Sequence, residues 1–408
     1  MSCTEAVSQW EQTVSRHLPH LSRPQVVVLA VWSDAMIVCK SCGTTSGALW
    51  LSELLGGTYD AWRQRLREWC YHGEDKKGTH RSEVVGVSCF APLLRWILEW
   101  WGEGEQRLAL AMDASTLSDR FTVLCVSVVY RGCALPVAWC IVPSGQAGAW
   151  KPDWLALFGC LDAVVPAQWT VIVLADRGLY ARWLYEGIQQ LGWHPFLRIN
   201  KGGKARPKGS DTSHWLSTFV PVQGYAWSGP VRCFTEASSR LDCTLVARWD
   251  EEYQDPWLIV TDLLPSQADV AWSAMRAWVE CGFKDTKRGG WHWHLTKMED
   301  PARAERHWLV MAVATLWVGS VGGEVDAKQP ASTLANLPET HIARRLDKGR
   351  KKQRKMSCFA RGIMLITVAL LRGRCLPTGQ FVPVPWPTSP EESEGQASFL
   401  AEIEKTYP

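Results

Sequence analysis

The stretch TVIVLADRG, residues 170–178, decides the fold of this chain. A short, continuous apolar run is typical of a strand that is buried on both faces, as in a parallel sheet. The strand ends at Asp176, directly before Arg177 and Gly178. A carboxylate at this end of a central strand is costly unless something compensates it, and ligands of α/β sheets bind at this edge. The stretch therefore predicts an α/β fold with a polar site at Asp176.

The segments around this strand alternate between strand and helix. Upstream, three β-rich runs precede a stretch of helical period, and Arg131–Gly132 is typical of a tight hairpin turn between the second and third runs. Downstream, a helical stretch and a further apolar run follow. The order β-β-β-α-β-α-β predicts three antiparallel strands that lead into a parallel sheet. Strands are expected over 108–114, 122–130, 134–142 and 194–199, and helices over 152–165 and 180–191.

The rest of the chain divides by pattern. The N-terminal region has helical period, with Ser22 and Thr58 as candidate N-caps. A basic, Gly-containing loop after residue 200 is followed by short strand-like runs, and one helix is expected over about 267–287. We expect a helical N-terminal domain over 1–104, a core over 105–200 and 266–325, a β-rich insertion over 201–265, and a basic C-terminal region over 326–408 with a flexible acidic tail.

The composition excludes several classes of protein. Of the 408 residues, 47% are hydrophobic and 21% charged, which excludes wholesale disorder, collagen and a coiled coil. The two longest apolar runs, 308–321 and 362–371, are shorter than the roughly 20 residues that span a bilayer, so we expect buried helices and no membrane partner. The start of the chain carries acidic residues and no apolar signal-peptide core, which predicts a cytoplasmic protein.

The 14 cysteines are expected to be buried thiols, since the chain is neither short nor predicted to be secreted. Cys39 and Cys42 form a CxxC pair, but no second pair follows at zinc-ligand spacing. A structural zinc is therefore the less favoured alternative.

Basic residues are concentrated in a few segments, although the net charge is only +3. Residues 344–355 contain eight basic residues and one acidic residue, and residues 198–208 contain five basic residues and no acid. Each run alone fits a solvated loop as well as a binding surface, but two runs favour a polyanionic partner. The candidate phosphate contacts are Arg63, Arg67, Arg198, Lys201, Lys204, Arg206, Lys208, Lys284, Arg288, Arg344, Arg345, Lys348, Arg350, Lys351, Lys352, Arg354 and Lys355.

Two further acids are candidates to join Asp176 in one site. Asp113 follows the apolar run LALAM and is expected to close its strand. Adjacent strands would place Asp113 beside Asp176, and two neighbouring carboxylates need a cation such as Mg²⁺ or Mn²⁺. Glu280, on the predicted helix, is the candidate third acid. Arg276 and Lys287 share its helical face, so Arg276 can orient the carboxylate and Lys287 can hold a phosphate.

Simpler interpretations compete with this one. The helix could be an ordinary surface helix whose Arg276–Glu280 pair contributes only tenths of a kcal/mol. Asp285 lies five residues after Glu280 and is expected to face another way. Asp119, Asp153 and Asp162 are also near the other candidates in sequence.

Taken together, the strand order, the two aspartates and the helix resemble a DDE-type transposase of a bacterial insertion sequence. The helix is similar to the signature Tyr-x2-Arg-x3-Glu-x6-Lys of one group of these enzymes, with Arg276, Glu280 and Lys287 in place. Ser273, beside Trp272, stands where that signature has tyrosine. The resemblance covers roughly residues 106–320.

The resemblance implies a ribonuclease-H-like core with a β-rich insertion and an α-helical N-terminal domain that binds DNA. It also implies binding to the terminal inverted repeats of a mobile element, a homodimer on two double-stranded DNA ends, and cut-and-paste transposition into target DNA in the bacterial cytoplasm, at the nucleoid. Two Mg²⁺ or Mn²⁺ ions held by Asp113, Asp176 and Glu280 would serve strand cleavage and strand transfer. Trp291 and Trp293 could stack on an unpaired base, although packing in the core is the favoured role.

Two other functions remain open at this stage. A structure-specific nuclease on the same core would cut DNA without rejoining it. A DNA-binding protein derived from a transposase would keep the acids without using them.

Overall fold

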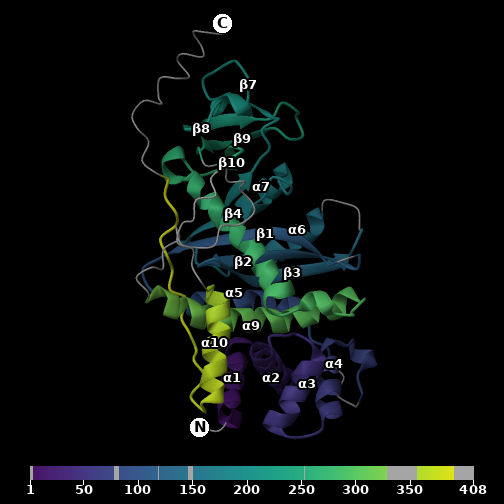
Figure 1. Ribbon diagram of the computed structural model, residues 1–408. Coiled ribbons are helices and arrows are strands. Elements are labelled where there is room, and N and C mark those ends of the chain that lie inside the picture. The colour runs from purple at the N-terminus through teal and green to yellow at the C-terminus, as the bar shows by residue number, and fades with distance from the viewer. Residues whose placement is uncertain are drawn as a thin grey trace. The chain divides into compact units, whose positions relative to one another are not determined.

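The computed structural model describes residues 3–77, 82–117, 119–145, 150–251, 253–328 and 356–389. The basic run 344–355 and the acidic tail lie outside these ranges. The described residues belong to two compact units, coloured by position along the chain in Figure 1. Unit 1 takes its described residues from Met1–Trp169, Trp278–Pro338 and Lys352–Val384, and unit 2 takes them from Thr170–Ala277 and Pro385–Pro408.

The N-terminal part of unit 1 is helical, as predicted. Gln25 accepts a hydrogen bond from the backbone N–H of Ser22 (2.9 Å), which starts the second helix beside Pro24. The Thr58 hydroxyl accepts from the Ala61 N–H (3.2 Å) and caps the fourth helix. These helices are α1 (Cys3–His17), α2 (Arg23–Cys39), α3 (Thr44–Leu55), α4 (Tyr59–Cys70) and α5 (Phe90–Glu99), with 3-10 turns at Gly73–Asp75 and Gly86–Cys89.

An antiparallel sheet of three strands follows in the same unit, in the order β3-β2-β1. The predicted hairpin turn is confirmed, since Arg131 and Gly132 have φ of 46° and 79°, as a type I′ turn requires. Every residue of the middle strand is buried, and α5, α6 and α9 contact the third strand. The elements are β1 (Arg107–Leu117), β2 (Phe121–Tyr130), β3 (Cys133–Pro143) and α6 (Lys151–Gly159), the last shorter than predicted.

A long helix, α9 (Pro301–Ala327), is the central element of unit 1. In Figure 1 it lies between the three strands and the N-terminal helices, and it contacts α2, α4, β2, β3 and α10 (Cys358–Leu371). By length and composition α9 could cross a bilayer, as could the bent pair α2 and α3 if counted as one span. However, 89% of the most apolar window of α9 is buried inside the fold, as expected of a core helix.

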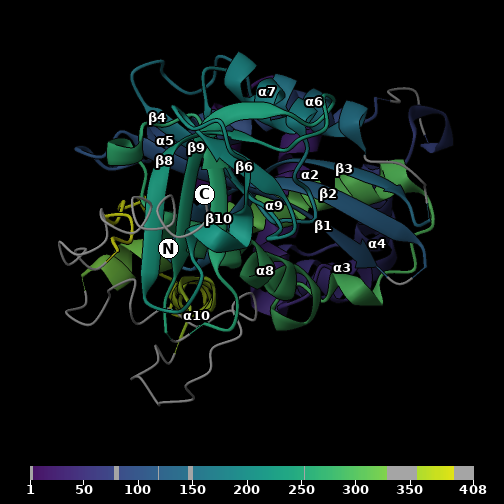
Figure 2. The same ribbon diagram turned by 90° about the horizontal axis from the view of Figure 1, so that it is seen from above.

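Unit 2 is built on a mixed sheet in the order β4-β5-β10-β9-β8-β6-β7. The predicted buried strand forms β4 and pairs in parallel with β5, with α7 between them in sequence. Strands β8 and β9 lie side by side as a long hairpin, seen in Figure 2. The elements are β4 (Thr170–Ala175), α7 (Arg182–Gln190), β5 (His194–Arg198), β6 (Lys204–Pro207), β7 (His214–Trp215), β8 (Tyr225–Cys233), β9 (Leu241–Trp249) and β10 (Trp257–Thr261).

The β-rich segment after residue 200 continues the β4–β5 sheet. Its last strand, β10, is fully buried and pairs antiparallel with β5 on one side and with β9 on the other. The continuous apolar sequence of β10, WLIVT, explains this central position.

The segment expected as one regular helix over 267–287 has three geometries. A 3-10 turn (Val270–Arg276) leads into α8 (Ala277–Lys284), and a π turn (Asp285–Gly289) follows. The expectation of a regular helix is therefore wrong. The Thr286 hydroxyl donates to the Gly282 carbonyl (2.9 Å), a side-chain bond that competes with the backbone ladder and bends helices. Spacing along an ideal helix consequently does not fix where its side chains point.

Two glycines allow α9 and α10 to pack closely, and this contact provides a test of the fold. A Cβ at Gly362 would overlap the backbone carbonyl of Val318, so Gly362→Ala has to push the two helices apart. We expect the variant to lose about 3 kcal/mol of unfolding free energy in urea denaturation, because a backbone cannot move aside as a side chain can. Gly159→Ala, where a Cβ meets nothing within 4 Å, is the matched control and should unfold like the wild type. Equal stability of both variants would contradict the α9–α10 packing.

A buried acid on α2 makes stability depend on pH. Asp34 is fully buried, and burial raises the pKa of its carboxyl from 3.8 to about 7. The folded chain then holds a proton that the unfolded chain has lost, so stability falls as pH rises from about 4 to about 7. The Asp34→Asn variant lacks this titration. From pH 4 to pH 8 the difference in unfolding free energy between variant and wild type should therefore shift by a few kcal/mol in favour of the variant. Denaturation of both proteins at both pH values measures this shift. An unchanged difference between the two proteins would show that Asp34 does not titrate in this range.

Candidate active site

Asp176 follows the last residue of β4 in unit 2, as predicted. Its Oδ1 accepts a hydrogen bond from the Arg177 N–H (2.8 Å), and its Oδ2 lies 3.9 Å from the Arg276 guanidinium. Arg276 is 7% exposed, whereas a third of the Asp176 side chain reaches solvent. Arg276 thus holds the carboxylate from the buried side and leaves its outer side accessible.

A second arginine adds positive charge to this part of unit 2. Arg198 on β5 is buried, and its guanidinium stacks on the Trp257 ring at 4.2 Å from the centroid. Burial lowers the pKa of Arg198, while the negative charge of Asp176 acts in the opposite direction. Arg198 was expected at a DNA surface, but its burial under Trp257 fits a role beside Asp176 better than a phosphate contact.

Asp113 lies on β1 in unit 1, although it does not close that strand as expected. The strand continues to Leu117, which pairs with Phe121 of β2. Ser115 and Thr116 extend the pairing opposite Val123 and Thr122, and the β-branched Thr116 is of a type that favours strands. Asp113 is half-buried opposite Cys125, and its Oδ1 accepts from the Ala114 N–H (2.9 Å).

Glu280 lies on α8, also in unit 1, and is half-buried. The helix packs closely on the start of β3, because a Cβ at Gly282 would lie only 2.8 Å from that of Ala134. Asp285, its competitor, is half-buried, and desolvation raises the pKa of its carboxyl to about 7. A carboxyl that holds a proton near neutral pH is a poor ligand for a cation, which favours Glu280 over Asp285.

Lys287 ties this helix to the strand that carries Asp113. Its Nζ donates to the Ser115 hydroxyl (2.8 Å) and to the Thr116 carbonyl (2.6 Å). Burial lowers the pKa of Lys287, and Arg288 adds a repulsion in the same direction. The π turn sets the direction of Lys287, so its contact with β1 could not be found from sequence spacing.

Ser273, at the position of the signature tyrosine, lies in unit 2 on the 3-10 turn before Arg276. It is 6% exposed, and its hydroxyl has no hydrogen-bond partner within the described ranges.

The two tryptophans after the helix are core residues. Trp291 and Trp293 have no exposed surface. Trp291 donates to the Thr315 hydroxyl (2.9 Å), and Trp293 packs edge-on against Trp308 at 5.3 Å between centroids. Neither ring has a free face for a base, so the favoured alternative, packing in the core, fits this arrangement.

The side chains of the remaining predicted phosphate contacts are buried to different extents. Lys204 extends over the Trp215 ring, with Nζ 4.7 Å from the centroid, and Arg206 is half-buried. Exposed side chains belong to Arg67, Lys201, Lys208, Lys284 and Arg288.

The three acids offer the oxygen donors that Mg²⁺ and Mn²⁺ prefer, so their chemistry fits the implied ions. Asp113 and Glu280 belong to unit 1 and Asp176 to unit 2. Within the described ranges, no three or more His, Cys, Asp or Glu side chains lie close enough to hold a metal ion. The match between these residues and the implied ions therefore rests on their carboxylate oxygens and not on a set of ligands already gathered around one point.

Comparison with known proteins bears on this segment of the chain. Residues 156–317 match the model of the protein family described as "Transposase DDE domain". No curated protein matches the chain significantly. The matched range includes Asp176, Arg276, Glu280 and Lys287, and it begins after Asp113. The fold is mixed α/β, and the match supports a transposase of the DDE type, a class of nucleotidyl-transfer enzymes that act on DNA and generally use divalent metals.

Proposed function

We propose that this protein is the transposase of a bacterial insertion sequence. It binds the terminal inverted repeats of its element, cuts the DNA there and joins the freed 3′ ends to target DNA. The observation that carries the proposal is the location of Asp176, Arg276, Glu280 and Lys287 within the single segment that matches a transposase DDE domain.

The proposal includes a ribonuclease-H-like core. Its support is the chain order of the antiparallel strands β1, β2 and β3 followed by the parallel pair β4 and β5. The acid-bearing segments belong to this set, because Asp113 lies on β1 and Asp176 directly follows β4. Glu280 comes from α8, after the strands that extend the β4–β5 sheet.

In this proposal Asp113, Asp176 and Glu280 hold the divalent ions. Two bound Mg²⁺ or Mn²⁺ ions would supply activation of a water or a 3′-hydroxyl and stabilisation of the leaving oxygen. Arg276 keeps the Asp176 carboxylate oriented from its buried side. Lys287 acts as a positioning residue, because its bonds to Ser115 and Thr116 fasten the Glu280 segment to β1.

The proposal extends to assembly and location. A homodimer on two DNA ends, acting at the bacterial nucleoid in the cytoplasm, would bring both ends of the element into one complex. The match to a DNA-acting family supports DNA as the partner.

The three acids provide the main test of this function. Asp113→Asn, Asp176→Asn and Glu280→Gln each replace a charged ligand by an amide of the same shape, which holds Mg²⁺ far less well. We expect each variant to lose strand cleavage by at least about a hundredfold while it still binds DNA, since losing a few kcal/mol of charge stabilisation has that effect on rate. Cleavage of labelled duplexes that carry the inverted repeats flanking the gene, with Mg²⁺ added, measures this.

Asp162→Asn is the matched control, because Asp162 is exposed and lies within the same family match. It should cleave like the wild type. Normal cleavage by all three triad variants would exclude the proposed mechanism. Metal-dependent cleavage without joined product would favour the structure-specific nuclease, and binding without any cleavage would favour a catalytically silent DNA-binding protein.

A further inference from the structure

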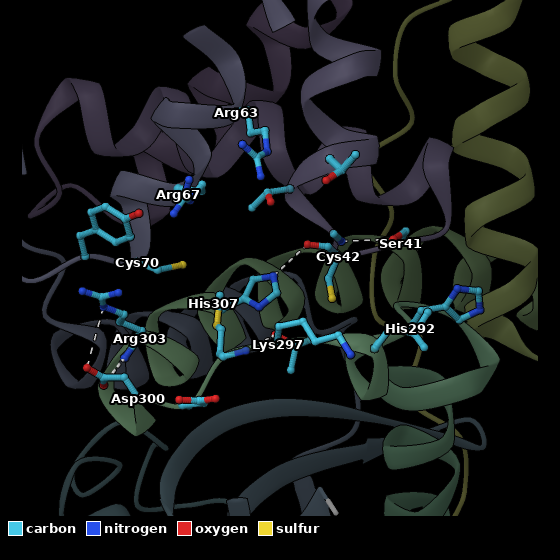
Figure 3. Close-up of a pocket in the computed structure, with 18 residues that line it drawn as sticks. Ser41, Cys42, Arg63, Arg67, Cys70, His292, Lys297, Asp300, Arg303 and His307 are labelled. Atoms are coloured by element: carbon cyan, nitrogen blue, oxygen red, sulfur yellow. Dashed lines mark hydrogen bonds and ion pairs between the residues drawn. The ribbon is translucent and has the colours of Figure 1, made fainter. Parts of the chain in front are cut away.

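Unit 1 contains a cavity of about 780 Å³ that the proposed catalytic residues do not line. Its walls are the start of α3, one side of α4, and the chain from His292 to the first turns of α9, as Figure 3 shows. This volume is in the range of sites that bind small molecules or parts of larger ligands.

Besides Arg303, three cationic side chains line this cavity from opposite sides. Arg63 and Arg67 project from α4, and Lys297 comes from the segment before α9 (Figure 3). The Nε of Arg63 is buried and has no hydrogen-bond partner within the described ranges. A buried guanidinium nitrogen without a partner loses its hydration, so an anionic acceptor in the cavity would restore a bond.

The acids of the cavity wall compensate only part of this charge. Asp300 is already engaged, since it lies 3.0 Å from the His72 ring and 3.8 Å from Arg303. Arg303 pairs in turn with Asp75 at 2.8 Å. Among the described lining residues, Glu299 is the other acid, and it is exposed. The cavity therefore keeps an excess of positive charge.

The amino-terminal end of α3 contributes further donors. Its N-cap is Gly43, which has no side chain to cap the helix, and Thr44 and Thr45 line the cavity. The first N–H groups of a helix have no partner inside the helix and carry the positive end of its dipole. Together with the cations these groups form the kind of surface that binds phosphate.

The inner wall holds a neutral histidine. His307 on α9 is 3% exposed, and its Nε2 donates to the Cys42 carbonyl at 2.9 Å. Burial lowers the pKa of His307 to about 4, so its Nδ1 carries a lone pair, and this atom has no partner within the described ranges. His307 is therefore neutral near pH 7 and adds no positive charge to the cavity wall.

We propose that this cavity binds a phosphate group through Arg63, Arg67, Lys297 and the amino-terminal N–H groups of α3. The assignment of a DNA strand as the source of that phosphate rests on the proposed function, and a free phosphate compound is the other source. None of the three acids lines the cavity, so in this proposal the site anchors DNA and takes no part in strand cleavage.

Thermal unfolding with inorganic phosphate tests the cavity itself. A ligand that binds only the folded state raises the melting temperature, and at a hundredfold excess over Kd the gain is about 2.7 kcal/mol. We expect phosphate to raise the Tm of the wild type more than chloride at equal ionic strength. Arg67→Gln and Lys297→Gln should lose most of this shift. Both side chains are exposed, so these variants should fold even if Arg63→Gln does not.

Arg65→Gln is the matched control, because Arg65 lies on the same helix, is exposed, and rests over the Trp62 ring at 4.6 Å outside the cavity. It should keep the full phosphate shift.

Binding of a labelled DNA duplex at several salt concentrations identifies the source of the phosphate. Each lost phosphate contact lowers the slope of log K against log salt by about 0.9. We expect Arg67→Gln and Lys297→Gln to bind the duplex several-fold more weakly and with a slope lower by about one, and Arg65→Gln to match the wild type.

The outcomes separate the two proposals. A phosphate shift that depends on the cavity, with no change in duplex binding, assigns the site to a free phosphate compound. No phosphate shift together with wild-type duplex binding by the cavity variants overturns the phosphate site, even if the triad variants lose cleavage. A cavity-dependent shift combined with normal cleavage by the triad variants overturns the transposase and leaves the phosphate site standing.

Discussion

A carboxylate at the end of a buried strand has to be compensated, and this constraint governs the candidate active site. Asp176 follows β4 and meets Arg276 at 3.9 Å, so a buried cation holds its inner side. In unit 1 the half-buried ammonium of Lys287 donates to oxygens of Ser115 and Thr116 on β1. In each unit, therefore, a cation from residues 270–289 contacts a segment that bears a candidate acid. Arg276 lies beside Asp176 in unit 2, and Lys287 binds the strand that carries Asp113 in unit 1.

Local signals in the sequence were sufficient for much of the fold. Thr58 was identified as a cap because a hydroxyl before an amphipathic stretch can satisfy a free N–H, and Arg131–Gly132 was identified as a turn because it separates two apolar runs. Asp176 was selected as a candidate because a carboxylate directly after a buried strand is costly unless something compensates it. Prediction failed where contacts between residues distant in sequence determine the local structure. The π turn at Asp285 breaks the helical spacing, and β10 joins a sheet built by β5, far away in sequence.

The depth of side chains was the hardest property to predict. Arg198 was expected to contact DNA because of its type and its basic neighbours, but it is buried and stacks on Trp257, a residue distant in sequence. The cavity beside Arg63 is lined by three segments that are separate in sequence. The sequence therefore indicated Arg63 and Arg67 as candidates but not Lys297. A glycine N-cap at Gly43, before two threonines, was the one available signal for a helix start open to an anion.

The central claim is that Asp113, Asp176 and Glu280 share divalent ions. Anomalous diffraction from crystals of the protein–DNA complex grown with Mn²⁺ measures this most directly, because it locates the metal independently of activity. The account predicts manganese peaks coordinated by oxygens of all three side chains. Manganese bound elsewhere, with any of these carboxylates too distant to coordinate it, would contradict the account.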